Sequence, residues 1–264
     1  MKLGFIGCGN MATAMIRGII DSKMALPEEI CASAKSQKTK DKIVNELGIS
    51  LGEDNIAVAK SADVLFLAVK PQYYKEVIRE IRDVIPEGQI VVSIAPGKTL
   101  AWLAERLGDE VKIVRTMPNT PAMVKEGMLG LCGNSLVTTE ELEQMKKLCE
   151  SFGKAEIVPE HLIDVVVGVS GSSPAYVFLF IEAMADAAVA DGMPRAQAYK
   201  FAAQAVLGSA KMVLETGMHP GELKDMVCSP GGTTIEAVRV LEEKGLRSAV
   251  IEAQKACVKK ARDM

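Results

Sequence analysis

The sequence predicts an α/β protein whose first half forms a doubly wound parallel sheet and whose second half is entirely helical. Short apolar runs alternate with helical stretches in the first half, a glycine-rich loop follows the first run, and strand-like runs cease after about residue 159. The chain has 264 residues, or about 1.8 domains of ordinary size. We therefore expect two domains, residues 1–158 and 159–264.

Five apolar runs of the first half are predicted to be strands. Each is short, nearly unbroken in hydrophobicity and bounded by Gly, Pro or Asn, which is typical of strands buried on both faces of a parallel sheet. The runs are residues 3–6, 30–34, 64–69, 90–94 and 113–114. Helical periodicity fills the gaps between them, at residues 11–20, 38–47, 74–85 and 100–107.

The second half is predicted to contain four long helices rich in small residues, which let helix axes approach closely. They span residues 173–190, 195–215, 233–242 and 246–262. We expect these helices to pack as a tight bundle.

The composition excludes several classes of protein. Hydrophobic residues make up 48% and charged residues 25%, so the chain is not disordered. A net charge of −3 gives no sign of nucleic-acid or anionic-membrane binding, and 4% aromatic residues make base-stacking surfaces improbable. With two histidines, His161 and His219, we expect no multi-histidine metal site.

The cysteines and the N-terminus favour a reduced, cytoplasmic, soluble protein. The six cysteines are scattered without a C-x-x-C pair. The chain enters a strand pattern at once, without the layout of a signal peptide. No apolar run reaches the roughly 18–20 residues of a membrane span.

A G-x-G-x-x-A loop directly after the first predicted strand indicates a dinucleotide site of the Rossmann type. Gly7 permits the tight turn, Gly9 lets a pyrophosphate approach the backbone, and Ala12 lets the helix pack on the strand. The start of the following helix offers N–H groups to the phosphates. The alternative is a purely structural turn.

The end of the second predicted strand favours NADP over NAD, although NAD stays open. NAD enzymes place a carboxylate there for the ribose hydroxyls, but this stretch carries Ser33, Lys35, Ser36 and Lys38. Hydroxyls and lysines suit an additional ribose phosphate. The alternative is a solvated basic start to the next helix.

Further loops follow strand ends at residues 68–71, 94–97 and 117–121, where a doubly wound sheet binds ligands. We expect Lys70 and Asn119 to face the nicotinamide end. The prolines of these loops also turn the chain away from the sheet, which is the structural alternative.

A second motif, residues 225–234, lies in the helical half. The pair Gly231–Gly232 before a helix exposes consecutive backbone N–H groups, which suits a carboxylate. Thr233 or Thr234 has a simpler alternative role as the N-cap. His219 and Tyr176 are weaker candidates for a functional role. His219 alternatively begins a short helix, and Tyr176 alternatively packs in the core.

These motifs together resemble pyrroline-5-carboxylate reductase over essentially the whole chain. The matching segments are residues 5–11, 63–71, 115–121, 170–176 and 219–234, and the 229–234 signature is the most specific of them. The family more often has glycine where Ser173 stands. The resemblance implies reduction of L-1-pyrroline-5-carboxylate to L-proline with NAD(P)H, the last step of proline biosynthesis.

The resemblance also implies the site residues. The cofactor would lie along Ile6, Gly7, Cys8, Gly9, Asn10 and Met11, with Ser33 and Asn55 at its ribose-phosphate end and Ala68, Val69, Lys70, Pro71, Ile94, Ala95, Pro96 and Asn119 at its nicotinamide end. The substrate carboxylate would bind Ser229, Gly231, Gly232 and Thr233. The hydroxyl of Thr234 would contact the ring nitrogen, as the catalytic group. The family forms an interlocked homodimer through its helical domain, often assembled into a decamer.

The residue inventory suits this reaction. A cyclic imine is basic enough to arrive protonated, so orientation and electrostatic fit dominate the catalysis and no strongly perturbed acid is required. Lys70 would repel a cationic iminium, so we expect a ribose or structural role for it.

Two other functions stay open. A 3-hydroxyacid-type or F420-type dehydrogenase also joins a Rossmann half to a helical half, but hydroxyacid enzymes need a catalytic lysine that no motif here supports. A nucleotide-sensing module without catalysis would not need the 229–234 motif.

Overall fold

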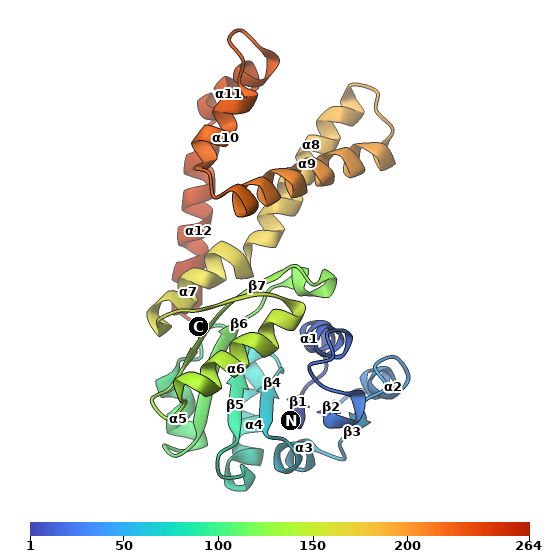
Figure 1. Cartoon of the computed structure of the whole chain (residues 1–264), viewed down its shortest axis with the longest axis vertical. Coiled ribbons are helices and arrows are strands. Elements are labelled where there is room, and N and C mark those ends of the chain that lie inside the picture. Colours follow the sequence, from blue (N-terminus) through green and yellow to red (C-terminus); the bar gives the residue numbers. More distant parts are fainter. The chain divides into compact units, whose positions relative to one another are not determined.

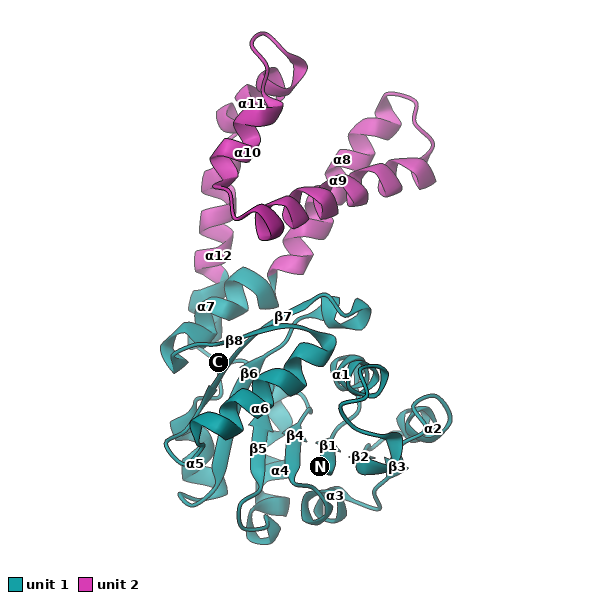
Figure 2. Cartoon of the chain, viewed as in Figure 1, with its two compact units in different colours: residues 1–172, 257–264 teal, residues 173–256 magenta.

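The computed structural model describes all 264 residues and divides into two compact units (Figure 2). Unit 1 comprises Met1–Ser172 together with Cys257–Met264, and unit 2 comprises Ser173–Ala256. The end of the chain therefore returns to unit 1. Nothing in the local sequence pattern signals this return.

Unit 1 is built on one eight-stranded sheet of order β3-β2-β1-β4-β5-β6-β7-β8 (Figure 1). All neighbouring pairs are parallel except β6 and β7. The strands are β1 Leu3–Ile6, β2 Ile30–Ser33, β3 Ser50–Leu51, β4 Val64–Leu67, β5 Ile90–Ser93, β6 Lys112–Met117, β7 Gly127–Gly133 and β8 Gly153–Ile157. The predicted doubly wound sheet is confirmed.

Three of these strands were not predicted from the sequence, for physical reasons. β3 has only two residues, both exposed. β7 reads GMLGLCG, and its three glycines resemble a loop. β8 alternates lysine and glutamate with small or apolar residues at the edge of the sheet, so it lacks an apolar run.

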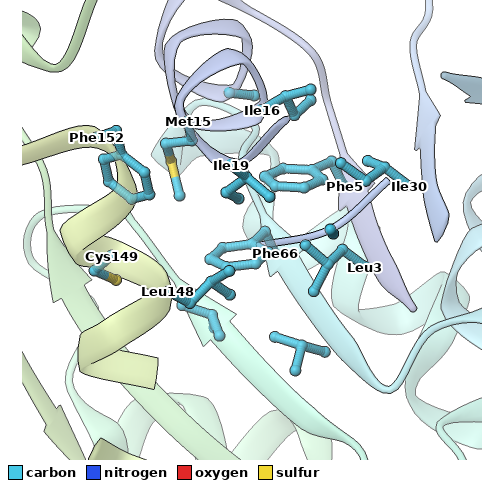
Figure 3. Packing of buried hydrophobic residues seen from close by; sticks show 14 of the residues in the cluster. Leu3, Phe5, Met15, Ile16, Ile19, Ile30, Phe66, Leu148, Cys149 and Phe152 are labelled. Atoms are coloured by element: carbon cyan, nitrogen blue, oxygen red, sulfur yellow. The ribbon is translucent and has the colours of Figure 1, made fainter. Parts of the chain in front are cut away.

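Helices cover both faces of the sheet and enclose two hydrophobic clusters. The helices of unit 1 are α1 Asn10–Asp21, α2 Gln37–Asn45, α3 Asn55–Ser61, α4 Tyr74–Ile81, α5 Leu100–Leu107, α6 Thr139–Cys149 and α7 Ile163–Val166. Helices α1, α2 and α6 pack on one face, where Phe5 stacks on Phe66 with ring centroids 4.6 Å apart (Figure 3). Helices α3, α4 and α5 pack on the other.

Arg115 is the largest fully buried side chain of unit 1. Its guanidinium on β6 is 1% exposed and donates to Asp164 Oδ1 at 2.7 Å and Glu160 Oε1 at 3.4 Å. Its Nε has no hydrogen-bond partner. The ion triad thus ties the segment around α7 to the sheet.

Unit 2 consists of helices α8 Ser173–Ala190, α9 Arg195–Thr216, α10 Pro220–Val227, α11 Thr233–Glu243 and the greater part of α12 Leu246–Arg262. The predicted helices are confirmed, and α10 is the short helix considered for His219. The expected tight bundle does not form within one chain. The only buried side chains of unit 2 are those of Ala185, Ala198 and Ala202. Large apolar side chains such as Phe178, Leu179 and Phe201 lie exposed.

The expectation that no apolar stretch is long enough to span a membrane is wrong for one segment. Helical turns follow each other from Glu160 to Ala190, and an 18-residue window there has a mean hydropathy of 1.6 with 22% of it buried. By length and composition this stretch is capable of crossing a membrane, and a helix covered by another subunit has the same properties.

Candidate functional site

A cavity of about 850 Å³ opens in unit 1 beside the carboxyl ends of three parallel strands. Its walls include Gly7–Gly9 after β1, Ala34–Ser36 after β2 and Ala68–Lys70 after β4. The chain proceeds from β1 toward one edge of the sheet through β2 and toward the other through β4. Doubly wound sheets bind nucleotides at this switch point.

The glycine loop fits a pyrophosphate. Gly7 has a φ of 92°, and a Cβ there would lie 2.9 Å from Val69 Cγ1 and 3.0 Å from the carbonyl oxygen of Ala68. Gly9 faces open space, with no atom within 4 Å of where its Cβ would be. Gly9 also caps α1 without a side-chain hydrogen bond, and the first turn holds no acidic residue. The loop therefore leaves N–H groups and room for an anion.

The end of the cavity beside β2, which we call the ribose end because the ribose is expected there, contains a hydrogen-bonded chain of three side chains. The hydroxyl of Ser33 donates to Asn55 Oδ1 at 2.7 Å, and Asn55 Nδ2 donates to Glu80 Oε2 at 2.6 Å. All three residues line the cavity. Ser33 is 4% exposed, so its hydroxyl has a fixed place at the end of β2.

Lysine and aromatic groups border the same end. Lys35 Nζ lies 3.0 Å from Glu76 Oε1 and 5.3 Å from the centroid of the Tyr73 ring. The Glu76 carboxylate raises the pKa of the Lys35 ammonium, which stays protonated at neutral pH. Lys35 thus supplies a cation beside the hydroxyls that follow β2, as the composition of that stretch predicts.

The structure brings one group of the expected cofactor residues together at the cavity. Its wall contains Gly7, Cys8, Gly9, Ser33, Asn55, Ala68, Val69 and Lys70. The other expected residues are not part of the wall: Ile6, Asn10, Met11, Pro71, Ile94, Ala95, Pro96 and Asn119. Ile6 and Ala95 are 1% and 3% exposed and pack in the core between the sheet and α3, α4 and α5.

Asn119 holds the backbone with both ends of its amide. Nδ2 donates to the carbonyl oxygen of Ser170 at 3.0 Å, and Oδ1 accepts from the N–H of Met128 at 3.0 Å. Ser170 belongs to the π-helical turn Val167–Gly171. The side chain, 6% exposed, therefore fixes that turn against β7. Asn119 thus has a structural role in its loop, and its contact with the cofactor stays a prediction.

Tyr74 links the ends of β4 and β5. Its buried hydroxyl donates to the carbonyl oxygen of Leu67 at 2.6 Å and accepts from Ser93 Oγ at 3.2 Å. Burial raises the pKa of Tyr74 to about 12, so the phenol stays protonated and contributes as a fixed hydrogen-bond donor. It thereby anchors the strand ends from which residues 68–71 and 94–97 depart.

Several wall residues were missed because they lie outside the motifs recognised in the sequence. They are Thr39, Glu53, Asp54, Ile56, Tyr73, Val77 and Glu80. Val77 and Glu80 on α4, with Tyr73 as the N-cap of that helix, have the spacing of one helix face. That periodicity indicates a helix face, and only the packing of α4 directs it at the cavity.

The second motif forms a tight turn in unit 2. Gly231 has a φ of 68°, and the N–H of Gly232 donates to the carbonyl oxygen of Ser229 at 3.0 Å. Gly232 caps α11 without a side-chain hydrogen bond, so neither Thr233 nor Thr234 serves as the N-cap. Space around Gly231 is open within 4 Å of where its Cβ would be. The N–H of Gly232 is thus engaged within the turn, contrary to the expected pair of free N–H groups, and the space open to an anion lies at Gly231.

His219 begins α10, as its simpler interpretation predicted. Its Nδ1 accepts the N–H of Gly221 at 3.0 Å, which makes it the N-cap of that helix. Near the glycine loop, burial raises the pKa of the Cys8 thiol, so the thiolate is disfavoured there.

The family follows from comparison with known proteins. The model for pyrroline-5-carboxylate reductase dimerisation matches residues 160–264, and the model for coenzyme F420-dependent NADP oxidoreductases matches residues 2–97. The chain is 57% identical to pyrroline-5-carboxylate reductase of Escherichia coli, covering 98% of this chain and 97% of that one. This chain belongs to the pyrroline-5-carboxylate reductase family.

Solved structures of the family agree along the whole length. The reductase of Coxiella burnetii has a TM-score of 0.92 at 37% identity and covers 99% of this chain and 97% of its own. The Plasmodium falciparum reductase, solved with NADP bound, has a TM-score of 0.90 at 30% identity. The match covers 100% of this chain and 97% of that one. The match to F420-dependent enzymes is confined to the Rossmann half, so the helical half distinguishes the family from that alternative.

Proposed function

We propose that this chain reduces L-1-pyrroline-5-carboxylate to L-proline with NADPH, the last step of proline biosynthesis. The observation that carries the proposal is the 57% identity to a pyrroline-5-carboxylate reductase across 98% of the chain. The cavity beside β1, β2 and β4 suits the cofactor, because Gly7 and Gly9 leave room for a pyrophosphate.

The chain's own residues bind and orient the reactants. When bound, the nicotinamide cofactor supplies the hydride. The N–H groups at the start of α1 hold its phosphates, while Ser33, Asn55 and Lys35 face its ribose. Tyr74 anchors the two strand ends beneath the nicotinamide loops. Positioning of this kind is sufficient because the imine substrate arrives protonated.

The turn before α11 is the proposed substrate site. Ser229, Gly231, Gly232 and Thr233 would hold the carboxylate, and the Thr234 hydroxyl would accept a hydrogen bond from the protonated ring nitrogen. Its support is the open space at Gly231 and the helix start without a side-chain cap. We assign residues 159–264 to substrate binding and dimerisation.

We also propose a homodimer formed through the helical half, assembled further to a decamer, in the cytoplasm and away from membranes. Its support is the exposed apolar surface of unit 2. Phe178, Leu179 and Phe201 are 61%, 66% and 66% exposed in the single chain. A second copy would cover this surface and account for the apolar stretch within Glu160–Ala190.

Spectrophotometry of NADPH oxidation with pyrroline-5-carboxylate tests the function. We expect turnover that requires both compounds and yields proline. A correctly folded protein that binds NADPH but shows no turnover would contradict the proposal and favour a nucleotide-sensing role. Parallel assays with NADH would measure the cofactor preference.

A further inference from the structure

The side-chain network at the ribose end of the cavity has a defined direction. A carboxylate only accepts hydrogen bonds, so Glu80 must face the NH2 group of Asn55, at 2.6 Å. This fixes the opposite end of the amide, Oδ1, toward Ser33. The Ser33 hydroxyl then donates its single proton to Asn55, at 2.7 Å.

The consequence lies in what Ser33 has left for a ligand. Its proton is committed, and its oxygen lone pairs remain available. A ribose 2′-hydroxyl is a donor that such an oxygen can accept from, whereas a 2′-phosphate needs donors. The network thus presents an acceptor at a place where NADPH would benefit from a donor.

The charge of Glu80 acts in the same direction. A 2′-phosphate carries about −1.5 to −2 charges at neutral pH, which the carboxylate at this end of the cavity repels. Lys35 provides the opposing cation, but Glu76 already pairs with it at 3.0 Å. NAD-preferring enzymes place a carboxylate at the end of the second strand, and this chain has none there. The carboxylate of Glu80 on α4 therefore partly takes over that role.

We propose that Glu80 is a specificity-determining residue, which reaches the ribose site through Asn55 and Ser33 and keeps NADH usable beside NADPH. This inference rests on the proposed use of nicotinamide cofactors. It assigns Glu80 a positioning role, since it acts on the ligand through Asn55.

The experiment compares Glu80→Gln with Glu53→Gln. Glutamine at position 80 removes the charge and can donate to Asn55, which lets the amide turn and releases the Ser33 proton for a phosphate. Glu53 lines the same cavity but is outside the network, so Glu53→Gln removes an equal charge and leaves the network intact.

Binding of two fragments isolates the 2′-phosphate without any turnover. Calorimetric titration with adenosine 2′,5′-bisphosphate and with adenosine 5′-monophosphate gives a ratio of affinities for each variant. In Glu80→Gln we expect the ratio to rise about tenfold in favour of the bisphosphate, and in Glu53→Gln about twofold or less. The ratio of kcat/KM for NADPH over NADH should follow the same order.

The outcomes separate this inference from the function. A ratio that stays constant in Glu80→Gln, or rises equally in both variants, overturns the role of Glu80 while the enzyme still reduces its substrate. Failure of the unmodified chain to bind either fragment overturns the cofactor site itself, and this inference with it. Melting temperatures of both variants, expected to be unchanged because the two side chains are exposed, exclude loss of fold as the cause.

Discussion

The two units of this chain differ in where they bury their apolar side chains. Unit 1 encloses two clusters on the two faces of its sheet, including Phe5, Phe66 and Phe152, each at most 1% exposed. Unit 2 buries only three alanines and exposes large apolar side chains along its helices. Unit 1 thus has an interior of its own, whereas unit 2 has an apolar surface that requires a covering partner.

The difference also separates two kinds of binding site. The cavity of unit 1 is shaped by three strand ends, two glycines and the buried hydrogen bonds of Tyr74. The turn of unit 2 lies at the start of a helix with an exposed outer surface. We infer that cofactor binding depends on the interior of unit 1, and that substrate binding depends on assembly through unit 2.

The largest expected effect concerns the turn of unit 2. In Thr234→Ala we expect kcat/KM for pyrroline-5-carboxylate to fall roughly 10- to 1000-fold, about 1.4–4 kcal/mol of transition-state stabilisation. The reason is the loss of the hydroxyl that we propose contacts the ring nitrogen. NADPH binding, which belongs to unit 1, should be unchanged.

Steady-state kinetics checks this result, with Thr216→Ala in the same unit as the control. The Thr216 hydroxyl bonds only to backbone groups at the end of α9: it donates to the carbonyl oxygen of Met212 and accepts from the N–H of Met218. Equal kinetics in wild type and Thr234→Ala would remove Thr234 from the mechanism.

The next effect tests whether unit 1 is stabilised from within. In Arg115→Met we expect the free energy of unfolding to fall by about 3 kcal/mol, because Asp164 and Glu160 lose the cation between them. The loss should be independent of protein concentration. Urea unfolding measures it, and Arg79→Met, on the exposed surface of α4, should change stability by about 0.5 kcal/mol or less. If the free energy of unfolding of Arg115→Met fell by no more than that of Arg79→Met, the ion triad would not stabilise unit 1.

A matched pair of substitutions compares the surfaces of the two units directly. Phe201 on α9 and Met123 in unit 1 are 66% and 65% exposed. We expect Phe201→Glu to weaken dimerisation about 30-fold, near 2 kcal/mol, since it places a charge in the proposed interface. Sedimentation velocity over a concentration series measures this effect.

Met123→Glu should leave the assembly unchanged if the interface belongs to unit 2. Dissociation of the dimer by Met123→Glu alone would reverse the comparison and place the interface on unit 1. A wild-type protein that sediments as a stable monomer would reject the proposed dimer altogether.

The smallest effect concerns one ion pair within unit 1. Lys112 on β6 donates to Glu141 in the first turn of α6, and this hydrogen bond is the main reason that the pKa of Glu141 is lowered. Because the pKa is lower in the folded chain, the stabilisation is present above the unfolded value and is lost as the pH falls through the folded one. Glu141→Gln should therefore cost about 0.5–1 kcal/mol at neutral pH.

Urea unfolding at several pH values checks the sign. The difference between wild type and Glu141→Gln should shrink as the pH falls through the lowered pKa of the folded chain, and vanish once the carboxyl is protonated in both the folded and the unfolded chain. A difference that grows in acid would show that the carboxylate destabilises the fold. Glutamine keeps the capping interaction with Thr138, so the substitution isolates the charge.

What the sequence determined by itself is local. The apolar runs of β1, β2, β4 and β5 are nearly unbroken because both faces of the sheet are covered. Gly7 stands where the turn leaves no room for a side chain, and Gly9 leaves open space at the start of α1. The resemblance built on such segments also predicted the family.

Only the tertiary structure decided the pairings between distant segments. Glu80 comes to the ribose end because α4 packs beside α3, Asn119 is engaged by Met128 and Ser170, and Cys257–Met264 returns to unit 1. The physical reason is range: periodicity and backbone strain act within a few residues, whereas burial and hydrogen-bond satisfaction depend on which elements meet.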